Sequence, residues 1–133
     1  MTLPLQLWDV YHLVSKHTNP PKPKFVVLMY IDPMPMAFFI NSAMNNFVLN
    51  RPRLHVCHVP ILQADHGFLA HDSFIDCQDV YPYPFSELTN WRGSIHPTAR
   101  AAVLQAVILC PVLPRQHKIA IAAANLPPTP GAI

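Results

Sequence analysis

The chain has 133 residues, of which 51% are hydrophobic and only 12% are charged, and its formal net charge is +2. This length predicts a single domain that can bury a core, and so small a net charge does not by itself establish nucleic-acid binding. Charged residues usually make up about a quarter of a domain, so we expect an exposed apolar surface that serves a homodimer or another partner.

The sequence has no feature of a secretory signal or of a membrane span. Residues 1–7 lack a basic start and a long apolar run, and no stretch of about 18 apolar residues is uninterrupted. The three cysteines, Cys57, Cys77 and Cys110, are an odd number at wide spacing, which does not indicate a disulfide framework. We therefore expect reduced, mostly buried cysteines and a cytoplasmic protein.

Five runs rich in β-branched and aromatic residues predict strands, at about 8–15, 24–31, 36–41, 54–61 and 73–78. The run from Lys24 to Ile31 is almost entirely apolar, as in a central strand that is buried on both faces. Residues 45–52 and 60–67 are expected to be polar loops. The 16 prolines indicate short strands with stiff connections, because proline removes a backbone donor.

The first of two C-terminal helices is predicted to begin at Pro97, because proline fits the first helical position. His96 is then the N-cap, and Pro111 ends the helix. The buried face of this helix is predicted from i, i+3, i+4 spacing to contain Ala99, Ala102, Val103, Ala106, Val107 and Cys110.

The second helix is predicted from Pro114 to Asn125, with Ile119 and Ala123 on one face, and its alanines favour the helix. Strands followed by helices predict an α+β domain or small β-barrel. We assign residues 1–125 to this single domain and residues 126–133 to a disordered proline-rich tail.

Several short segments occur in an informative order. Trp8-Asp9-Val10-Tyr11 is similar to an opening "GDvv" strand, with Trp8 in place of glycine. Lys24–Leu28 and Phe38–Ser42 are similar to "RPalvl" and "apiTs". Asp72-Ser73 before a β-rich run matches "gLkkDS", and residues 92–96 match the "lGkLs" segment that caps a closing helix. Over residues 7–113 the chain thus resembles the PemK/MazF-type toxin family.

This resemblance implies an SH3-like barrel that cleaves single-stranded RNA without a metal, as a homodimer held in check by an antitoxin peptide. In the family, an arginine of the first loop and a Thr or Ser after the third strand supply much of the chemistry. Lys24 stands at the arginine position beside Lys22, and Ser42 stands at the Thr/Ser position. His17, in the same loop, is a candidate base. The predicted catalytic residues are therefore Lys24, Ser42 and His17.

Lys22, Arg51 and Arg53 are the predicted RNA-binding residues, because they are basic and near strand ends, with aromatic residues close by. A zinc site is not indicated, since on a strand His55 and Cys57 would share a face while His58 points away. The sequence also has no P-loop or GxGxxG motif. We therefore predict no metal and no cofactor.

Two classes of function remain open. The first is a toxin-like endoribonuclease of a toxin–antitoxin system. The second is a catalytically inactive PemK/MazF-like binding module, phage- or plasmid-borne, that acts through protein–protein contacts. The first loop lacks the family's glycines and Arg-Pro pair, and a lysine cannot make the planar bidentate contact of an arginine. This difference favours the second class, whereas the strand order is shared by both.

Overall fold

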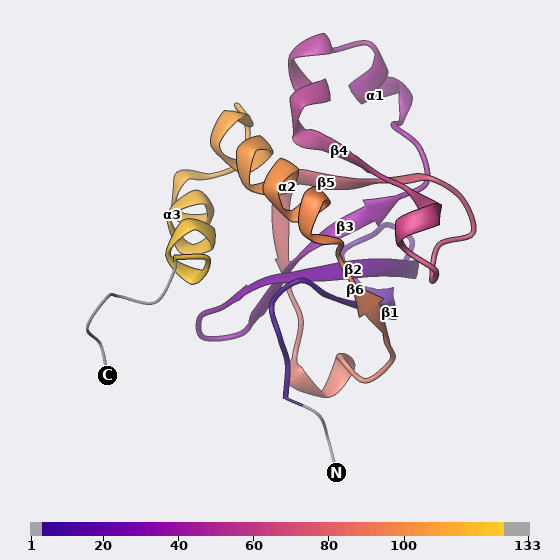
Figure 1. Cartoon of the computed structure of the whole chain (residues 1–133), viewed down its shortest axis with the longest axis vertical. Helices are drawn as coiled ribbons and strands as arrows, with labels where there is room; N and C mark the ends of the chain where they lie inside the picture. Colours follow the sequence, from indigo (N-terminus) through magenta and orange to yellow (C-terminus); the bar gives the residue numbers. More distant parts are fainter. Residues whose placement is uncertain (1–3, 127–133) are drawn as a thin grey trace.

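A computed structural model describes residues 4–126 and shows a strongly bent sheet with helices packed against it (Figure 1). The six strands are β1 (Asp9–Ser15), β2 (Lys22–Ile31), β3 (Pro35–Asn41), β4 (His58–Ile61), β5 (Ser73–Pro82) and β6 (Trp91–Ser94). Their order in the sheet is β4-β5-β3-β2-β1-β6, and every neighbouring pair is antiparallel. The predicted bent antiparallel sheet with C-terminal helices is confirmed.

The helices are α1 (Asn46–Leu49), α2 (Pro97–Leu109) and α3 (Arg115–Ala124), and short 3₁₀ turns lie at Pro52–Cys57 (η1), Gln63–Asp65 (η2) and Phe85–Glu87 (η3). The predicted start of α2 is confirmed, since the side chain of His96 accepts a hydrogen bond from the Thr98 N–H. Burial of Val103, Ala106 and Val107 confirms most of its predicted apolar face, although Ala102 is exposed.

Two local predictions are wrong, and one strand was not predicted. Residues 54–57 form the end of η1 instead of a strand, because Pro52 starts a tight turn that delays β4 until His58. The predicted loop at 45–52 contains α1, and β6 was not predicted. On α3, Ile119 and Ala123 share one face as predicted, but this face is exposed and Ile121 is the buried residue.

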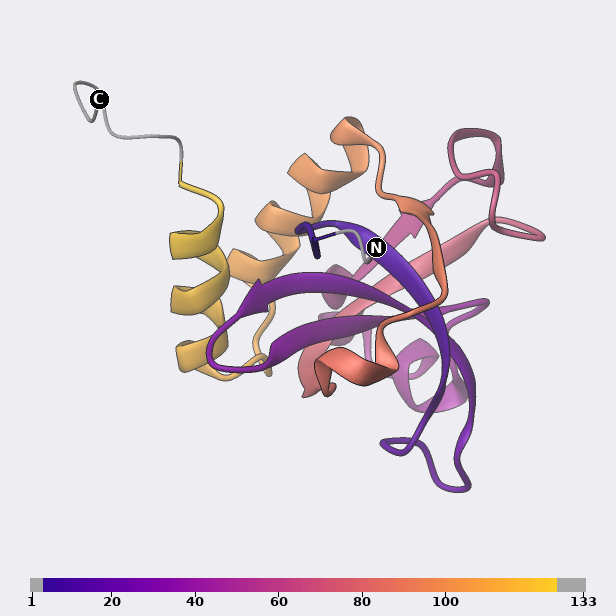
Figure 2. The same ribbon diagram turned by 90° about the horizontal axis from the view of Figure 1, so that it is seen from below.

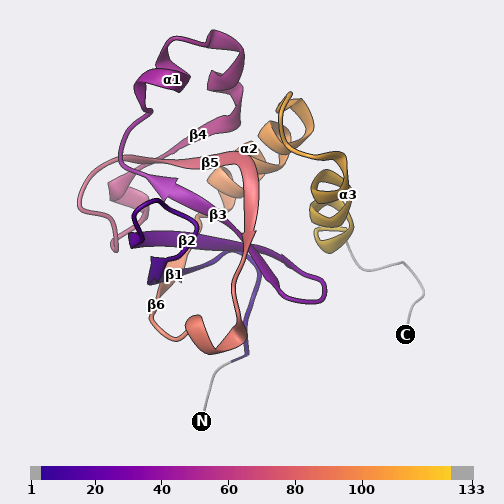
Figure 3. The same ribbon diagram turned by 180° about the vertical axis from the view of Figure 1, so that it is seen from behind.

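The two faces of the sheet differ in their cover. On one face, α2 lies across the strands and closes the larger core, in which Val27, Ile75 and Val103 are fully buried (Figure 1). On the other face, which Figure 3 shows from behind, no helix crosses β2, β3 and β5. There a smaller cluster around Val26 and Tyr83 is covered by the segment that contains η3 (Figure 2), and Leu5 of the N-terminal segment also packs against it. We call these the covered face and the open face.

Trp8 has a left-handed backbone, with φ of +74°, which is unusual for a bulky residue. Its ring is only 5% exposed, and its Nε1–H donates to Asn125 Oδ1 at 3.0 Å. The backbone explains why glycine is usual here in the similar family, since glycine adopts positive φ without steric cost. Trp8 adopts this unfavourable backbone conformation, and its side-chain hydrogen bond links the start of β1 to the end of α3.

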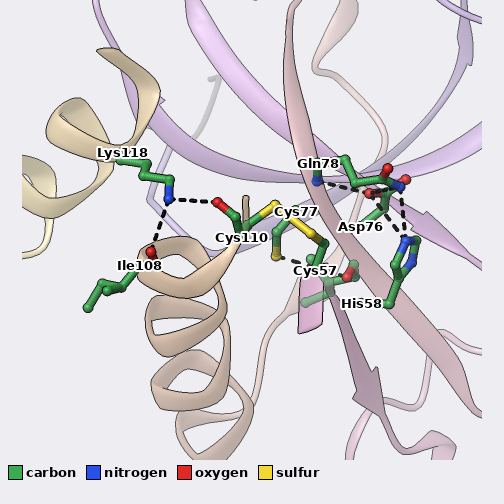
Figure 4. The surroundings of a disulfide bond; sticks show 9 residues. Cys57, His58, Asp76, Cys77, Gln78, Ile108, Cys110 and Lys118 are labelled. Atoms are coloured by element: carbon green, nitrogen blue, oxygen red, sulfur yellow. Dashed lines mark hydrogen bonds and ion pairs between the residues drawn. A yellow bond between two sulfur atoms is a disulfide. The ribbon is translucent and has the colours of Figure 1, made fainter. Parts of the chain in front are cut away.

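Cys57 and Cys110 form a disulfide that joins the end of η1 to the end of α2 (Figure 4). The prediction that all cysteines are reduced is therefore wrong for this pair, because the fold brings together residues separated by 53 positions. Cys77 is free and buried, as expected. Beside the bridge, the ammonium of Lys118 donates to the carbonyl oxygens of Cys110 and Ile108 at 2.7 and 3.0 Å, which satisfies the end of α2.

Some predictions concern parts that the structure does not test. Apart from Leu126, the predicted tail lies outside the described residues, and the domain boundary at 125 stays a prediction. None of the helices within residues 4–126 is long and apolar enough to cross a membrane.

Candidate functional site

A cavity of about 320 Å³ lies where β1, β2 and β3 meet the loop before β5. The residues that line it are His12, Lys22, Pro23, Lys24, Phe25, Ile40, Ser42, Leu69, Ala70, His71 and Ser73. The strand register brings three of these residues side by side, because His12 pairs with Phe25 and Phe25 pairs with Ile40 across the sheet. Three of the predicted site residues, Lys22, Lys24 and Ser42, thus border one cavity.

Lys24 is half-buried at the boundary between this cavity and the open face. Its ammonium donates to Asn41 Oδ1 and lies 5.0 Å from the centre of the Phe39 ring. Burial lowers the pKa of Lys24, the charge of Lys22 lowers it further, and Asp76 acts in the opposite direction. A lowered pKa makes the ammonium a better proton donor near neutral pH.

A hydrogen-bonded chain extends from Asn41 across the open face. Asn41 Nδ2 donates to Asp76 Oδ2 at 3.3 Å. Gln78 Nε2 donates to Asp76 Oδ1 at 3.2 Å and to His58 Nε2 at 3.0 Å (Figure 4). His58 also lies 3.9 Å from Asp76, but burial lowers its pKa more than Asp76 raises it, so we regard His58 as neutral. Asp76 therefore holds Asn41, and through it Lys24.

His17 does not border the cavity. Its Nε2–H donates to the Pro82 carbonyl at 2.8 Å, and its ring centre lies 5.2 Å from those of Tyr81 and Tyr83. Tyr81 in turn stacks on Phe39 at 4.3 Å. The Phe39–Tyr81 stack therefore stands between His17 and Lys24, and the structure does not bring His17 together with the other two predicted catalytic residues.

Two other histidines, His12 and His71, line the cavity. His71 Nδ1 lies 3.0 Å from the Asp72 carbonyl oxygen. A carbonyl only accepts, so Nδ1 carries the hydrogen and Nε2 is the basic nitrogen. His12 packs its ring against Phe25, with 4.9 Å between centres. His71 was not among the predicted site residues, although it stands directly before the Asp72-Ser73 pair that carries part of the family resemblance.

Arg51 and Arg53 lie on the α1–η1 segment and do not line the cavity. The guanidinium of Arg51 is 3.7 Å from the Phe47 ring centre and donates to the Phe47 carbonyl at 2.9 Å. Their predicted role in RNA binding thus belongs to a separate surface. Within residues 4–126, no group of three or more His, Cys, Asp and Glu side chains is placed to hold a metal ion.

Comparisons with known proteins identify the fold. No family model matches the chain. Among solved structures, the Mycobacterium tuberculosis toxin MazF-mt6 matches with a TM-score of 0.55 and 12% identity, over 74% of this chain and 90% of that one. At this identity the likeness shows the fold alone, and the chain has the MazF-like fold that the sequence predicted.

One curated protein also matches part of the sequence. Endoribonuclease YbeY of Acidothermus cellulolyticus is 37% identical over 79 residues, which are 53% of this chain and 48% of that protein. The chain therefore spans about half the length of the curated relative it matches.

Proposed function

We propose that the chain is a toxin-like endoribonuclease that cleaves single-stranded RNA without a metal ion. The observation that carries the proposal is the cavity in which Lys22, Lys24 and Ser42 meet on a MazF-like fold. The two similar proteins named above support this proposal, since one is named a toxin of the MazF type and the other an endoribonuclease.

The cavity supplies the groups that RNA cleavage needs. His71 Nε2 removes the proton of a 2′-hydroxyl, whose oxygen attacks the neighbouring phosphorus. The bond from phosphorus to the 5′-oxygen breaks, and the Lys24 ammonium donates a proton to that leaving oxygen. Lys22 and the Ser42 hydroxyl stabilise the phosphate oxygens as negative charge develops. The products are a 2′,3′-cyclic phosphate and a 5′-hydroxyl.

The proposal includes a homodimer that is inhibited by an antitoxin peptide. The predicted cytoplasmic location depends on reduced cysteines, and the Cys57–Cys110 bridge removes that support for it. Exposed apolar side chains near the α2–α3 connection, which include Ile108, Leu109 and Val112, support a protein contact. A standard interface buries about 1,200–2,000 Å² in total. Light scattering at micromolar concentration is expected to give twice the chain mass of 15.0 kDa, and a monomer without any partner would contradict the dimer.

The nuclease is tested by expressing the chain alone and by incubating the purified protein with RNA in EDTA. Growth arrest and cleaved RNA are expected. Lys24→Ala should lower the cleavage rate by about 10²–10³-fold, as for other losses of one charge-stabilising group, with an unchanged melting temperature. Lys16→Ala is the matched control, because Lys16 is an exposed lysine that pairs with Glu87 outside the cavity.

The histidine assignment is tested in the same assay. His71→Ala should lower cleavage by about 10²–10⁴-fold, whereas His17→Ala should have a much smaller effect because its ring lies beyond the Phe39–Tyr81 stack. If His17→Ala lowered cleavage more than His71→Ala does, His17 and not His71 would be assigned as the base. Intact RNA at high soluble expression of the wild-type chain would contradict the nuclease and favour the catalytically inactive binding module.

A further inference from the structure

A second cavity, of about 520 Å³, lies between the loop that follows η2 and strand β6. Asp65 lines it from the end of η2, His66 and Phe68 line it from the loop, and Trp91, Arg92 and Gly93 line it from β6. None of these residues takes part in the chemistry described above, so this cavity has no role in that mechanism.

Two aromatic side chains form the walls of this cavity. Trp91 is 55% exposed, which is unusual for so large an apolar side chain, and Phe68 is half-buried. Gly93 has a φ of +154°, and a Cβ at this position would lie 2.9 Å from Phe68 Cδ1. A glycine is therefore required for the Phe68 ring to lie directly against β6.

The loop that carries Phe68 is fixed by His66, which is almost fully buried. His66 Nδ1–H donates to the Leu62 carbonyl at 2.8 Å, and His66 Nε2 accepts from the backbone N–H of His96 at 3.1 Å. The imidazole thus joins the loop to the start of α2, and its ring centre lies 5.8 Å from that of Phe68. The aromatic wall is held in place before any ligand binds.

The polar groups of the cavity match the edge of a nucleobase. Arg92 and Asp65 are both exposed, and neither is in an ion pair within residues 4–126. An arginine donates to base acceptors and an aspartate accepts from base amino groups. Aromatic faces with a nearby cation hold unstacked bases of single-stranded nucleic acid.

The second cavity adjoins the first through a pair of aromatic rings. The Phe68 ring centre lies 5.6 Å from that of Phe25, and Phe25 lines the cavity that contains Lys24 and Ser42. We propose that the second cavity binds a nucleobase of the RNA strand next to the phosphate in the first cavity, in contact with the Trp91 and Phe68 rings that line it. This inference rests on the proposed function, because it assigns a base subsite to the same substrate.

Tryptophan fluorescence measures occupancy of this subsite directly. The chain has two tryptophans, of which Trp8 is 5% exposed and Trp91 is 55% exposed. The probe is a short single-stranded RNA whose 2′-hydroxyls are all methylated, so that it binds without being cleaved. We expect saturable quenching, and a loss of affinity of roughly 5- to 150-fold in Trp91→Ala, the range for removal of one stacking partner.

Three further measurements test whether the loss of RNA affinity is specific to this subsite. Phe85→Ala removes an aromatic side chain of similar exposure, 56%, on η3, which lines neither cavity, and should leave affinity unchanged. Trp91→Phe should restore most of the affinity because it keeps a stacking face. An RNA that lacks one base at the bound position should bind the wild-type chain as weakly as the complete RNA binds Trp91→Ala, with no further loss when both changes are combined.

These measurements distinguish failure of the proposed base subsite from failure of the proposed nuclease activity. Quenching and a Trp91-dependent affinity without any RNA cleavage would support the base subsite and contradict the proposed catalysis. RNA cleavage by the wild-type chain together with normal binding by Trp91→Ala would support the catalysis and overturn the subsite. Absence of any binding to the methylated RNA would overturn the subsite as well.

Discussion

The covered and open faces of the same sheet carry different kinds of side chains. Beneath α2, the covered face is a continuous apolar core that includes Phe38, Ile75 and Val107. The open face has a smaller apolar cluster, next to which Lys24, Asn41 and Asp76 form a polar chain. Apolar burial stabilises the fold, whereas partial burial lowers the pKa of Lys24 and makes it a candidate for chemistry. The apolar core is thus concentrated on the covered face and the Lys24–Asn41–Asp76 chain on the open face, while the cavity at the end of these strands also borders core residues such as Ile40 and Leu69.

The largest expected effect comes from placing a charge in the covered face. Val103 is fully buried under the sheet, so Val103→Asp should cost more than about 4 kcal/mol, because an unpaired buried charge has no compensating partner. We expect no cooperative melt by circular dichroism. Gln105→Asp on the exposed side of α2 is the matched control. A melt near the parent temperature for Val103→Asp would show that α2 does not pack on this face.

The next largest effect on stability is expected from reducing the disulfide, which joins the end of α2 to the end of η1 beside the covered face. Cross-linking residues 53 positions apart is expected to stabilise the chain by about 4 kcal/mol through restriction of the unfolded state. Guanidinium unfolding with and without a reductant should show this difference. After unfolding without reductant, alkylation should label Cys77 alone, and labelling of all three cysteines would contradict the bridge.

Substitution of Lys24 is expected to change the cleavage activity without changing the stability of the fold. Its ammonium is charged below its pKa, which burial places under the ordinary value of 10.5. Cleavage should therefore be supported at neutral pH and decline in the alkaline range as pH rises through that lowered pKa. Lys24→Arg should remove this alkaline decline, because a guanidinium stays protonated, while lowering the rate. An identical pH profile in both proteins would show that another group titrates.

The smallest effect concerns Trp8 at the start of β1. Both Trp8→Ala and Trp8→Gly lose the ring that packs in the covered face, but the backbone at φ of +74° remains. A left-handed backbone costs residues other than glycine about 1–2 kcal/mol. The glycine variant should therefore be more stable than the alanine variant by about 1 kcal/mol, which is the reverse of the usual order in strands and helices. Denaturant midpoints of the two variants measure the difference.

Much of the fold was predictable because local sequence determines it. The apolar run of β2 and the Pro97 start of α2 follow from periodicity and from the missing N–H of proline, and both are confirmed. Strand β6 was not predicted, since its four residues are mostly exposed and it exists through pairing with β1. The same applies to the Cys57–Cys110 bridge, which depends on contacts between distant segments and leaves no local signal.

The candidate site was predictable only where segment order was informative. Lys22, Lys24 and Ser42 were placed by their positions in the strands, and they share a cavity. His71 and Asp76 were passed over, because their roles depend on how β5 and its preceding loop lie against β3. A loop histidine such as His17 has no register to constrain it, so the sequence did not show that it packs against Tyr81.

The strand order has a consequence for how copies of the chain meet. Its outermost strands, β4 and β6, have only four residues each. Pro60 in β4 lacks an N–H, and the pairing of β6 with β1 contains a register shift. Short, irregular edges of this kind are poor templates for adding a further strand. Growth into a continuous intermolecular sheet is therefore disfavoured, and copies of the chain are expected to associate through side-chain surfaces.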